Sequence, residues 1–183
     1  MIRVILGVTG GIAAFKACDL VSELREREIE CRVAMTPAAT RFIQPLTFCA
    51  LTGHEVLVDD LSEPFHPPMP HIEWGRWADG VVIAPATADF IGRLAGGLGS
   101  DSLSSLMLAL DPEKPVILAP AMNTWMWSNE FVQRNLALLR SAGEGRRFRI
   151  VEPVEKRLAC GDFGIGGLAD VRDIADVVAA AVR

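Results

Sequence analysis

Short apolar runs alternate with longer amphipathic stretches along the chain, and this alternation constrains the fold more than any other feature of the sequence. Val81-Val82-Ile83-Ala84 is apolar at consecutive positions, which is typical of a strand that helices cover on both faces. The pattern predicts an α/β fold with a mostly parallel, doubly wound sheet. The expected strands are Arg3 to Val8, Arg32 to Thr36, Gly80 to Pro85, Val116 to Ala119 and Arg149 to Val151.

The stretches between these runs have the apolar spacing of helices. The expected helices are Ile12 to Arg27, Ala38 to Leu51, Phe90 to Leu110, Asn129 to Ala142 and Val171 to Val182. Ser62 to Pro70 is rich in proline and Glu155 to Gly167 is rich in glycine, so we expect both to be irregular. Long irregular segments in compact domains often carry function, which makes both of them candidate parts of a site.

Length and charge narrow the class of protein. The chain has 183 residues and half of them are apolar, which suits one domain that spans residues 1–183. A net charge of −5 gives little support to a nucleic-acid partner or an anionic-membrane partner. The sequence has no signal-peptide pattern and no apolar stretch of membrane-spanning length, so we expect a cytoplasmic protein.

Four cysteines are present, and their spacing fits neither a metal site nor a disulfide framework. We therefore expect no bound metal. Cys18, Cys31 and Cys49 lie in helix-like or strand-like stretches and are interpreted as small buried hydrophobic residues. Cys160 lies in the glycine-rich segment, where a thiol can be accessible, so it is the candidate reactive cysteine.

A glycine-rich turn, Gly7-Val8-Thr9-Gly10-Gly11-Ile12, joins the first strand-like run to the first helix. Free backbone N–H groups and the helix dipole favour a phosphate at such a point. The second run ends at Thr36-Pro37-Ala38, and the carboxyl ends of neighbouring parallel strands meet at one edge of a sheet. The two turns together suggest a phosphate site. A turn without a ligand, and a simple helix cap at Thr36, are the alternatives.

Small and polar residues follow the third and fourth runs, in the segments Pro85 to Phe90 and Pro120 to Trp127. Small side chains let a flat ring approach the backbone, and Asn123 supplies an amide donor and acceptor just past a strand end. His71 begins a short helix-like stretch, and an isolated histidine at such a place is usually structural or exposed. We expect three bulky residues nearby to be ordinary core residues: Met122, Met126 and Trp127.

Taken together, these motifs resemble those of the homo-oligomeric flavin-containing cysteine decarboxylases, and the resemblance covers almost the whole chain. Its motifs are Gly7 to Ala14, His71 to Asp79, Pro85 to Asp89, Pro120 to Trp127 and Leu158 to Asp162, in this order. The family implies a flavodoxin-like (Rossmann-like) fold, FMN bound at subunit edges, and trimers that can assemble into dodecamers. Within it, the chain looks most similar to enzymes that decarboxylate 4′-phospho-N-pantothenoyl-L-cysteine, a step of coenzyme A biosynthesis.

The resemblance implies a role for each matched residue. His71 matches the catalytic histidine, Cys160 the proton-donating cysteine and Asn123 the substrate-binding asparagine. A clamp over the substrate would contain Arg157, Leu158 and Ala159. The implied FMN contacts are Gly10, Gly11, Ile12, Thr36, Pro37, Ala38, Thr87, Ala88, Asp89, Phe90 and Ala121.

The sequence departs from the family pattern in two places. Many relatives have asparagine and threonine where this chain has Asp89 and Phe90, and the contact made through that asparagine can differ here. The clamp ends in Gly166-Gly167-Leu168, where enzymes fused to the ligase commonly have Gly-Arg-Met, so contacts of that arginine are not carried over. Because the sequence shows no second domain, we expect the cysteine-adding ligase to be a separate protein.

Three other functions share parts of this pattern. Peptidyl-cysteine decarboxylases of the same family have the histidine and asparagine motifs but generally lack the Ala-Cys-Gly-Asp motif found at 159–162. Flavin prenyltransferases share the fold but not the set of His71, Asn123 and Cys160. Flavin-binding regulatory subunits without catalytic activity usually carry acidic extensions, which this sequence lacks.

Overall fold

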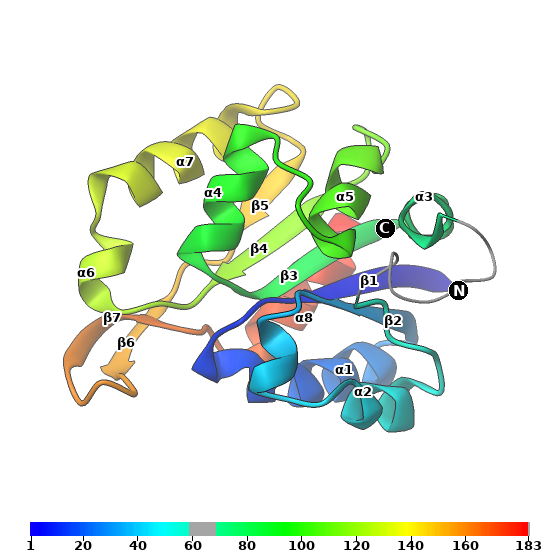
Figure 1. Ribbon diagram of the computed structural model, residues 1–183, viewed down its shortest axis with the longest axis horizontal. Coiled ribbons are helices and arrows are strands. Elements are labelled where there is room, and N and C mark those ends of the chain that lie inside the picture. The colour runs from blue at the N-terminus through cyan, green and yellow to red at the C-terminus, as the bar shows by residue number, and fades with distance from the viewer. Residues whose placement is uncertain (59–68, 183) are drawn as a thin grey trace.

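The computed structural model describes residues 1–58 and 69–182, and the statements below concern these residues. Five parallel strands form a central sheet in the order β2-β1-β3-β4-β5 (Figure 1). The chain adds β2 on one side of β1 and then adds β3, β4 and β5 on the other side, as in flavodoxin-like folds. Ligands of such sheets bind near the point between β1 and β3 where the side of addition changes. The doubly wound parallel sheet is confirmed. The strands are β1 (Ile2–Val8), β2 (Ile29–Met35), β3 (Gly80–Ala86), β4 (Val116–Pro120) and β5 (Phe148–Ile150).

Helices cover both faces of the sheet (Figure 1). One face packs against α1 (Ala17–Glu26), α2 (Pro45–Thr52) and α8 (Val171–Ala181). The other face packs against α3 (Pro70–Trp77), α4 (Ala88–Gly96), α5 (Ser102–Ala109) and α7 (Glu130–Ser141). Three short elements complete the helical part: η1 (Ile12–Lys16), η2 (Ala39–Arg41) and α6 (Thr124–Trp127). No helix within the described residues is long and apolar enough to cross a bilayer.

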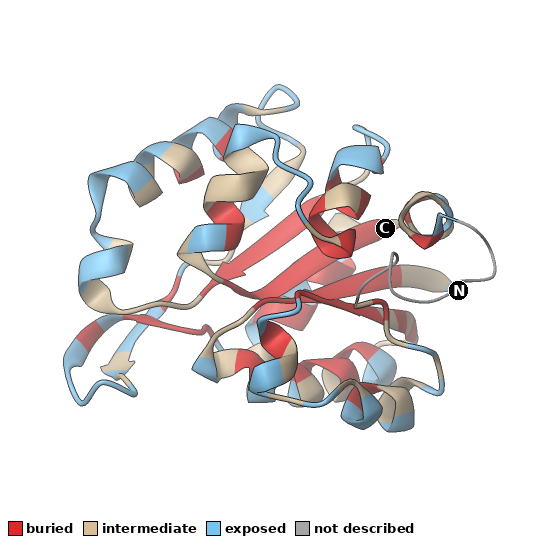
Figure 2. Cartoon of the chain, viewed as in Figure 1, coloured by how far each residue is buried: buried red, intermediate tan, exposed pale blue. Residues whose placement is uncertain are grey.

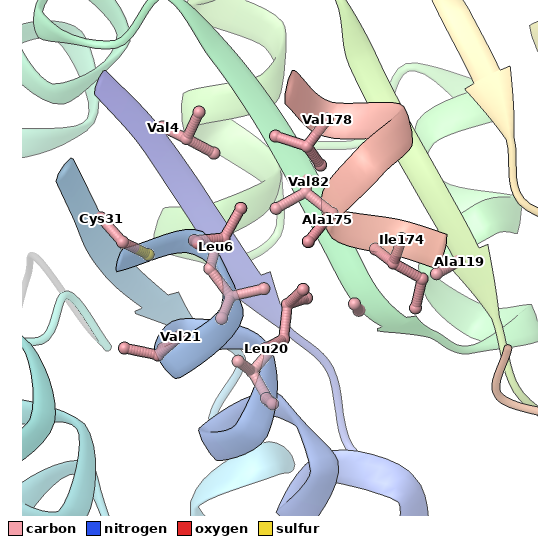
Figure 3. Packing of buried hydrophobic residues seen from close by; sticks show 14 of the residues in the cluster. Val4, Leu6, Leu20, Val21, Cys31, Val82, Ala119, Ile174, Ala175 and Val178 are labelled. Atoms are coloured by element: carbon pink, nitrogen blue, oxygen red, sulfur yellow. The ribbon is translucent and has the colours of Figure 1, made fainter. Parts of the chain in front are cut away.

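The core consists of two hydrophobic clusters, one on each face of the sheet. Alternate residues of β1 divide between them, since Leu6 belongs to the cluster with α1 and α8 and Ile5 to the cluster with α4, α5 and α7. The strands β3 and β4 are buried along their whole length (Figure 2). In the first cluster, Leu6 and Val82 lie among side chains of α1 and α8, as Figure 3 shows. Burial on both faces explains the consecutive apolar residues of these strands.

Two of the expected helices are divided. The stretch from 38 to 51 contains η2 and then α2, which begins with a proline at its first position. The stretch from 90 to 110 contains α4 and α5, because α4 ends at Gly97, which has a left-handed φ of 65°. Asp101 then caps α5 by accepting a hydrogen bond from the backbone N–H of Ser104 at 2.8 Å.

The glycine-rich segment from 155 to 167 is not irregular. It forms most of an antiparallel hairpin of β6 (Val154–Arg157) and β7 (Phe163–Gly167). A Cβ at Gly164 would lie 2.6 Å from Thr124 Oγ1, and one at Gly166 would collide with the carbonyl oxygen of Met122. These glycines therefore allow close packing against α6 rather than marking a loop. The proline-rich segment from 62 to 70 lies outside the described residues, except for Met69 and Pro70.

Candidate active site

The carboxyl ends of β1, β3 and β4 lie together at one edge of the sheet, next to the β6–β7 hairpin (Figure 1). A cavity of about 550 Å³ opens there, which is within the usual range of ligand and cofactor sites. The hairpin forms one of its walls. The expected site residues that line the cavity are Gly10, Gly11, Ile12, Thr87, Ala88, Ala121, Asn123, Arg157, Leu158, Ala159 and Cys160.

The turn after β1 is tied to the turn after β3 through a buried threonine. The Thr9 hydroxyl donates a hydrogen bond to the carbonyl oxygen of Pro85 at 2.6 Å and accepts one from the backbone N–H of Thr87 at 3.0 Å. The Thr87 hydroxyl in turn accepts a hydrogen bond from the backbone N–H of Phe90 and so caps α4. This network fixes Gly10 and Gly11 beside the amino end of α4.

The turn after β2 packs directly against the glycine turn, as the sequence predicts. A Cβ at Gly10 would lie 2.5 Å from the Cβ of Ala38, so the close approach of the two turns requires a glycine. Thr36 is buried, and its hydroxyl accepts a hydrogen bond from the backbone N–H of Ala39 at 3.3 Å. Thr36, Pro37 and Ala38 are not part of the cavity wall, and Ala38 is the residue of this turn that lies against Gly10.

Two of the expected flavin contacts point elsewhere. Phe90 is fully buried in the core beneath α4, and Asp89 forms an ion pair with Arg93 at the surface. Neither residue lines the cavity. The departure from the family pattern at these two positions therefore changes the core and the surface of α4 more than it changes the cavity.

Asn123 and Cys160 are brought together although 37 residues separate them. Asn123 caps α6 by accepting a hydrogen bond from the backbone N–H of Trp125 at 2.8 Å. Its Nδ2 lies 3.4 Å from the Cys160 Sγ, and the thiol lies 3.4 Å from the Asp162 carboxylate. Because Cys160 is exposed and lines the cavity, its thiol is accessible to a bound ligand.

His71 does not join this pair within one chain. It lies in the first turn of α3, and Figure 1 shows α3 at the opposite end of the longest molecular axis from α6 and the hairpin. Because a projection can only shorten a separation, α3 is far from α6 and the hairpin in space. Six residues were expected to act in catalysis or to contact the substrate, and the single chain brings five of them, all except His71, to one cavity.

The cavity wall is cationic. Of the described residues that line it, Lys16, Lys156 and Arg157 carry positive charge and none is acidic, although the whole chain has a net charge of −5. Sequence reasoning singled out only Arg157. Lys16 closes η1, directly after the glycine-turn motif, and its position there was the available signal. Lys156 had none, because its segment was not expected to form a strand.

Two expectations about side-chain burial need correction. Cys31 is buried, and burial raises the pKa of its thiol to about 12, but Cys18 and Cys49 are only half-buried. Met126 is 47% exposed, although we expected a core residue, because α6 has a single turn and that side chain lines the cavity. The other two bulky residues, Met122 and Trp127, are half-buried and pack against the core.

A second and larger hollow, of about 720 Å³, lies at the amino ends of β1 and β2. Its wall includes the chain start at Met1 and a His54–Glu30 pair with a nitrogen-to-oxygen distance of 3.3 Å. Open α/β sheets bind ligands at the carboxyl ends of their strands, which is the opposite edge. The cavity beside Cys160 is therefore the candidate active site. Among the residues that the structure describes, no group of three or more His, Cys, Asp or Glu side chains could hold a metal ion.

The chain matches the family model described as Flavoprotein over residues 1–183, and it belongs to this flavoprotein family. Membership identifies a flavin as its class of cofactor. The chain is 43% identical over 178 residues to the coenzyme A biosynthesis bifunctional protein CoaBC of Escherichia coli. The aligned region covers 97% of this chain and 42% of that protein. CoaBC of Haemophilus influenzae is 42% identical over 172 residues, with 94% of this chain and 42% of that protein covered. The chain thus spans less than half the length of these relatives.

Solved structures give the same family. A mutant PPC decarboxylase in complex with pantothenoylaminoethenethiol superposes with a TM-score of 0.82 at 34% identity, covering 98% of this chain and 97% of that chain. The FMN-dependent cysteine decarboxylase SpaF superposes with a TM-score of 0.82 at 33% identity, covering 100% and 98%. The peptidyl-cysteine decarboxylase EpiD, at 20% identity and a TM-score of 0.78, covering 98% and 99%, shares the fold.

Proposed function

We propose that this protein uses FMN to decarboxylate 4′-phospho-N-pantothenoyl-L-cysteine (PPC) to 4′-phosphopantetheine, in the cytoplasm, as a step of coenzyme A biosynthesis. One observation carries the proposal: the Asn123 amide lies 3.4 Å from the accessible Cys160 thiol, in the wall of a cavity at the carboxyl ends of the strands, where open α/β sheets bind ligands. Similarity to a PPC decarboxylase over nearly the whole chain, and to CoaBC proteins over this region, supports the same substrate.

The residues of the cavity fit FMN. Gly10 and Gly11 present backbone N–H groups next to the start of η1, where one terminal phosphate would be favoured. The residues after β3 and β4 that face the cavity include Ala88 and Ala121, whose small side chains leave room for a flat ring. When bound, FMN would accept a hydride from the carbon that bears sulfur and later return it, which gives the cysteine part an electron sink.

The chain's own residues would bind the substrate and move a proton. Asn123 would hold the carboxylate or amide of the cysteine end by hydrogen bonds and so orient the reacting carbon. Cys160 would donate a proton to the carbon from which CO2 has departed, because its thiol is exposed to the cavity. Arg157, Leu158 and Ala159, in and beside the hairpin turn, would cover the bound substrate.

We further infer that the active enzyme is a homo-oligomer, either a trimer or a dodecamer built from trimers, with sites shared between subunits. The helix α3, which contains His71, lies at the far end of the molecule from α6 and the hairpin, next to which Asn123 and Cys160 are found. A site that contains all three residues therefore needs at least two copies of the chain. In such a site His71 would contact the substrate of a neighbouring subunit, as a base or by orienting its carboxylate.

A second candidate function is decarboxylation of a peptide that ends in cysteine, which the similarity to SpaF favours. The charge of the cavity separates the two candidates. Three cationic side chains and no acidic one line it among the described residues, which suits a substrate with a phosphate dianion. PPC carries such a group and an unmodified peptide does not.

The test is to incubate the purified, FMN-loaded protein with PPC and to follow the product by mass spectrometry. We expect loss of CO2 and formation of 4′-phosphopantetheine, with no product when the flavin is omitted. A synthetic peptide with a C-terminal cysteine serves as the competing substrate. Turnover of the peptide and none of PPC by flavin-loaded protein would overturn the proposal in favour of the second candidate.

A further inference from the structure

The chain contains three lysines, and two of them, Lys16 and Lys156, lie close together in the cavity wall. Lys16 is the last residue of η1 and Lys156 belongs to β6. Neither lysine has an ion pair with a carboxylate among the contacts of the described residues. Two ammonium groups at one place repel each other, so this arrangement is unfavourable unless an anion lies between or beside them.

The position of Lys156 is fixed by the hairpin. Its Nζ donates a hydrogen bond to the carbonyl oxygen of Leu168 at 2.9 Å. Its stem crosses the backbone at Gly167, where an added Cβ would collide with the Cε and would lie 2.7 Å from the Cδ and the Cγ. The absence of a side chain at Gly167 thus leaves the space that the Lys156 stem fills, and the ammonium group is held at the cavity.

The surroundings of Lys156 disfavour its charge. Burial lowers the pKa of Lys156, and the nearby charge of Lys16 lowers it further, while Asp170 acts in the opposite direction. A bound anion would reverse this balance by stabilising both ammonium groups. Perturbed lysines that line a cavity are typical of functional sites, where a ligand supplies the missing charge.

We propose that Lys16 and Lys156 together form a binding site for a phosphate monoester. The proposal rests on the proposed function, which supplies two such groups, the 4′-phosphate of PPC and the phosphate of FMN. Five residues of 3₁₀-helix span about 10 Å, so Lys16 is well separated from the Gly10–Gly11 turn. Lys156 lies in the strand that leads to the turn carrying Cys160. An extended substrate with its cysteine end at Cys160 would place its phosphate toward the lysine pair.

Binding measurements on the FMN-loaded protein test the substrate arm. Isothermal titration compares 4′-phosphopantetheine with pantetheine, which differ only in the phosphate. We expect Lys156→Met and Lys16→Met, which keep an apolar stem, to weaken binding of 4′-phosphopantetheine by about tenfold or more and to leave pantetheine nearly unchanged. Lys156→Arg keeps the charge and should keep the preference for the phosphorylated ligand. Arg25→Met removes an exposed positive charge outside this cavity, and it is the matched control.

A second arm uses the flavin-free protein and compares FMN with riboflavin by fluorescence titration. A loss of about tenfold confined to FMN would assign the lysine pair to the flavin phosphate, which also supports the phosphate site. The proposed phosphate site would be overturned if the Lys16→Met and Lys156→Met proteins fold and still prefer the phosphorylated ligand, to the same extent as the unmodified protein, in both arms. If the unmodified protein binds neither FMN nor 4′-phosphopantetheine, the proposed function fails as well, so the two failures are distinguishable.

Discussion

Gly10 offers a sharp test of how the cavity is built, because its neighbour Gly11 provides a matched control in the same turn. A Cβ at Gly10 would lie 2.5 Å from the Cβ of Ala38 and 2.9 Å from that residue's carbonyl carbon. A Cβ at Gly11 would meet only the Cγ2 of Thr87, at 3.5 Å, which is an ordinary contact. Neither glycine has a left-handed φ, so backbone strain does not complicate the comparison.

The size of the effect follows from the atoms that must move. To accept alanine at position 10, the turns after β1 and β2 would have to separate by on the order of 1 Å, and such overpacking typically costs about 1–3 kcal/mol. For a chain of this length, that corresponds to a decrease in Tm of about 2–12 °C. Gly11→Ala should change the free energy of unfolding by less than about 0.5 kcal/mol.

The assay is urea and thermal unfolding of the flavin-free protein at one fixed protein concentration, because an oligomer's stability depends on concentration. FMN affinity is then measured for each variant. We expect Gly10→Ala to bind FMN at least about tenfold more weakly, since the displaced turn carries the backbone N–H groups that we propose to hold the FMN phosphate. Equal unfolding free energies for Gly10→Ala and Gly11→Ala would refute the conclusion that contact with Ala38 requires a glycine at this position.

Three further predictions address the chemistry and the electrostatics. Cys160→Ser should release CO2 once and accumulate the enethiol, the unsaturated thiol that remains after hydride removal and loss of CO2, because a serine hydroxyl is a far weaker acid than a thiol. Stopped-flow flavin absorbance with mass detection checks this. Cys49→Ser should turn over normally, and full multiple turnover by Cys160→Ser would exclude the thiol as the proton donor. His71→Asn and Cys160→Ser proteins should each form no 4′-phosphopantetheine, yet mixed oligomers of the two should form it. Mixed oligomers that native mass spectrometry confirms but that form none would count against a shared site. Burial opposes ionisation of Asp79, but hydrogen bonds from Arg3 prevail and lower the pKa of this carboxyl. Its contribution to stability is therefore present above the unfolded-state pKa, near 4, and is lost as the pH falls through the lower folded-state value; Asp79→Asn should lower Tm at pH 7 and weaken the loss of stability in acid, and an unchanged pH profile of Tm would contradict this.

The strands and the carboxyl-end site could be predicted from the sequence because they depend on local patterns. Val81 to Ala84 can be apolar at every position only where both faces are covered, and this requirement alone indicates a central parallel strand. The division of the stretch from 90 to 110 was missed, although Gly97 and Asp101 are respectively a typical helix end and a typical helix start. An apolar spacing that continues across both helices concealed the break.

The hairpin was missed for a different reason. Glycine has a low preference for strands, so Gly164 and Gly166 indicated a loop. Their function is set by α6, a tertiary neighbour that local sequence patterns do not reveal. The separation of His71 from Cys160 was likewise inaccessible to motif analysis, because motifs order residues along the chain and say nothing about which copy of the chain supplies each of them.

The relative position of Asn123 and Cys160 is set mainly by contacts between the hairpin and the segment from Met122 to Thr124. Gly164 and Gly166 lie on the same face of β7, two residues apart. Gly164 packs against the Thr124 side chain, and Gly166 packs against the backbone of Met122 and Asn123. The backbone N–H of Met122 also donates a hydrogen bond to the carbonyl oxygen of Gly166 at 2.9 Å. The turn that carries Cys160 is closed by its own backbone bonds, between 158 and 162 and between 161 and 158. Replacing the thiol therefore leaves these supports in place, so a change in turnover of Cys160→Ser reports on proton transfer rather than on displacement of the hairpin.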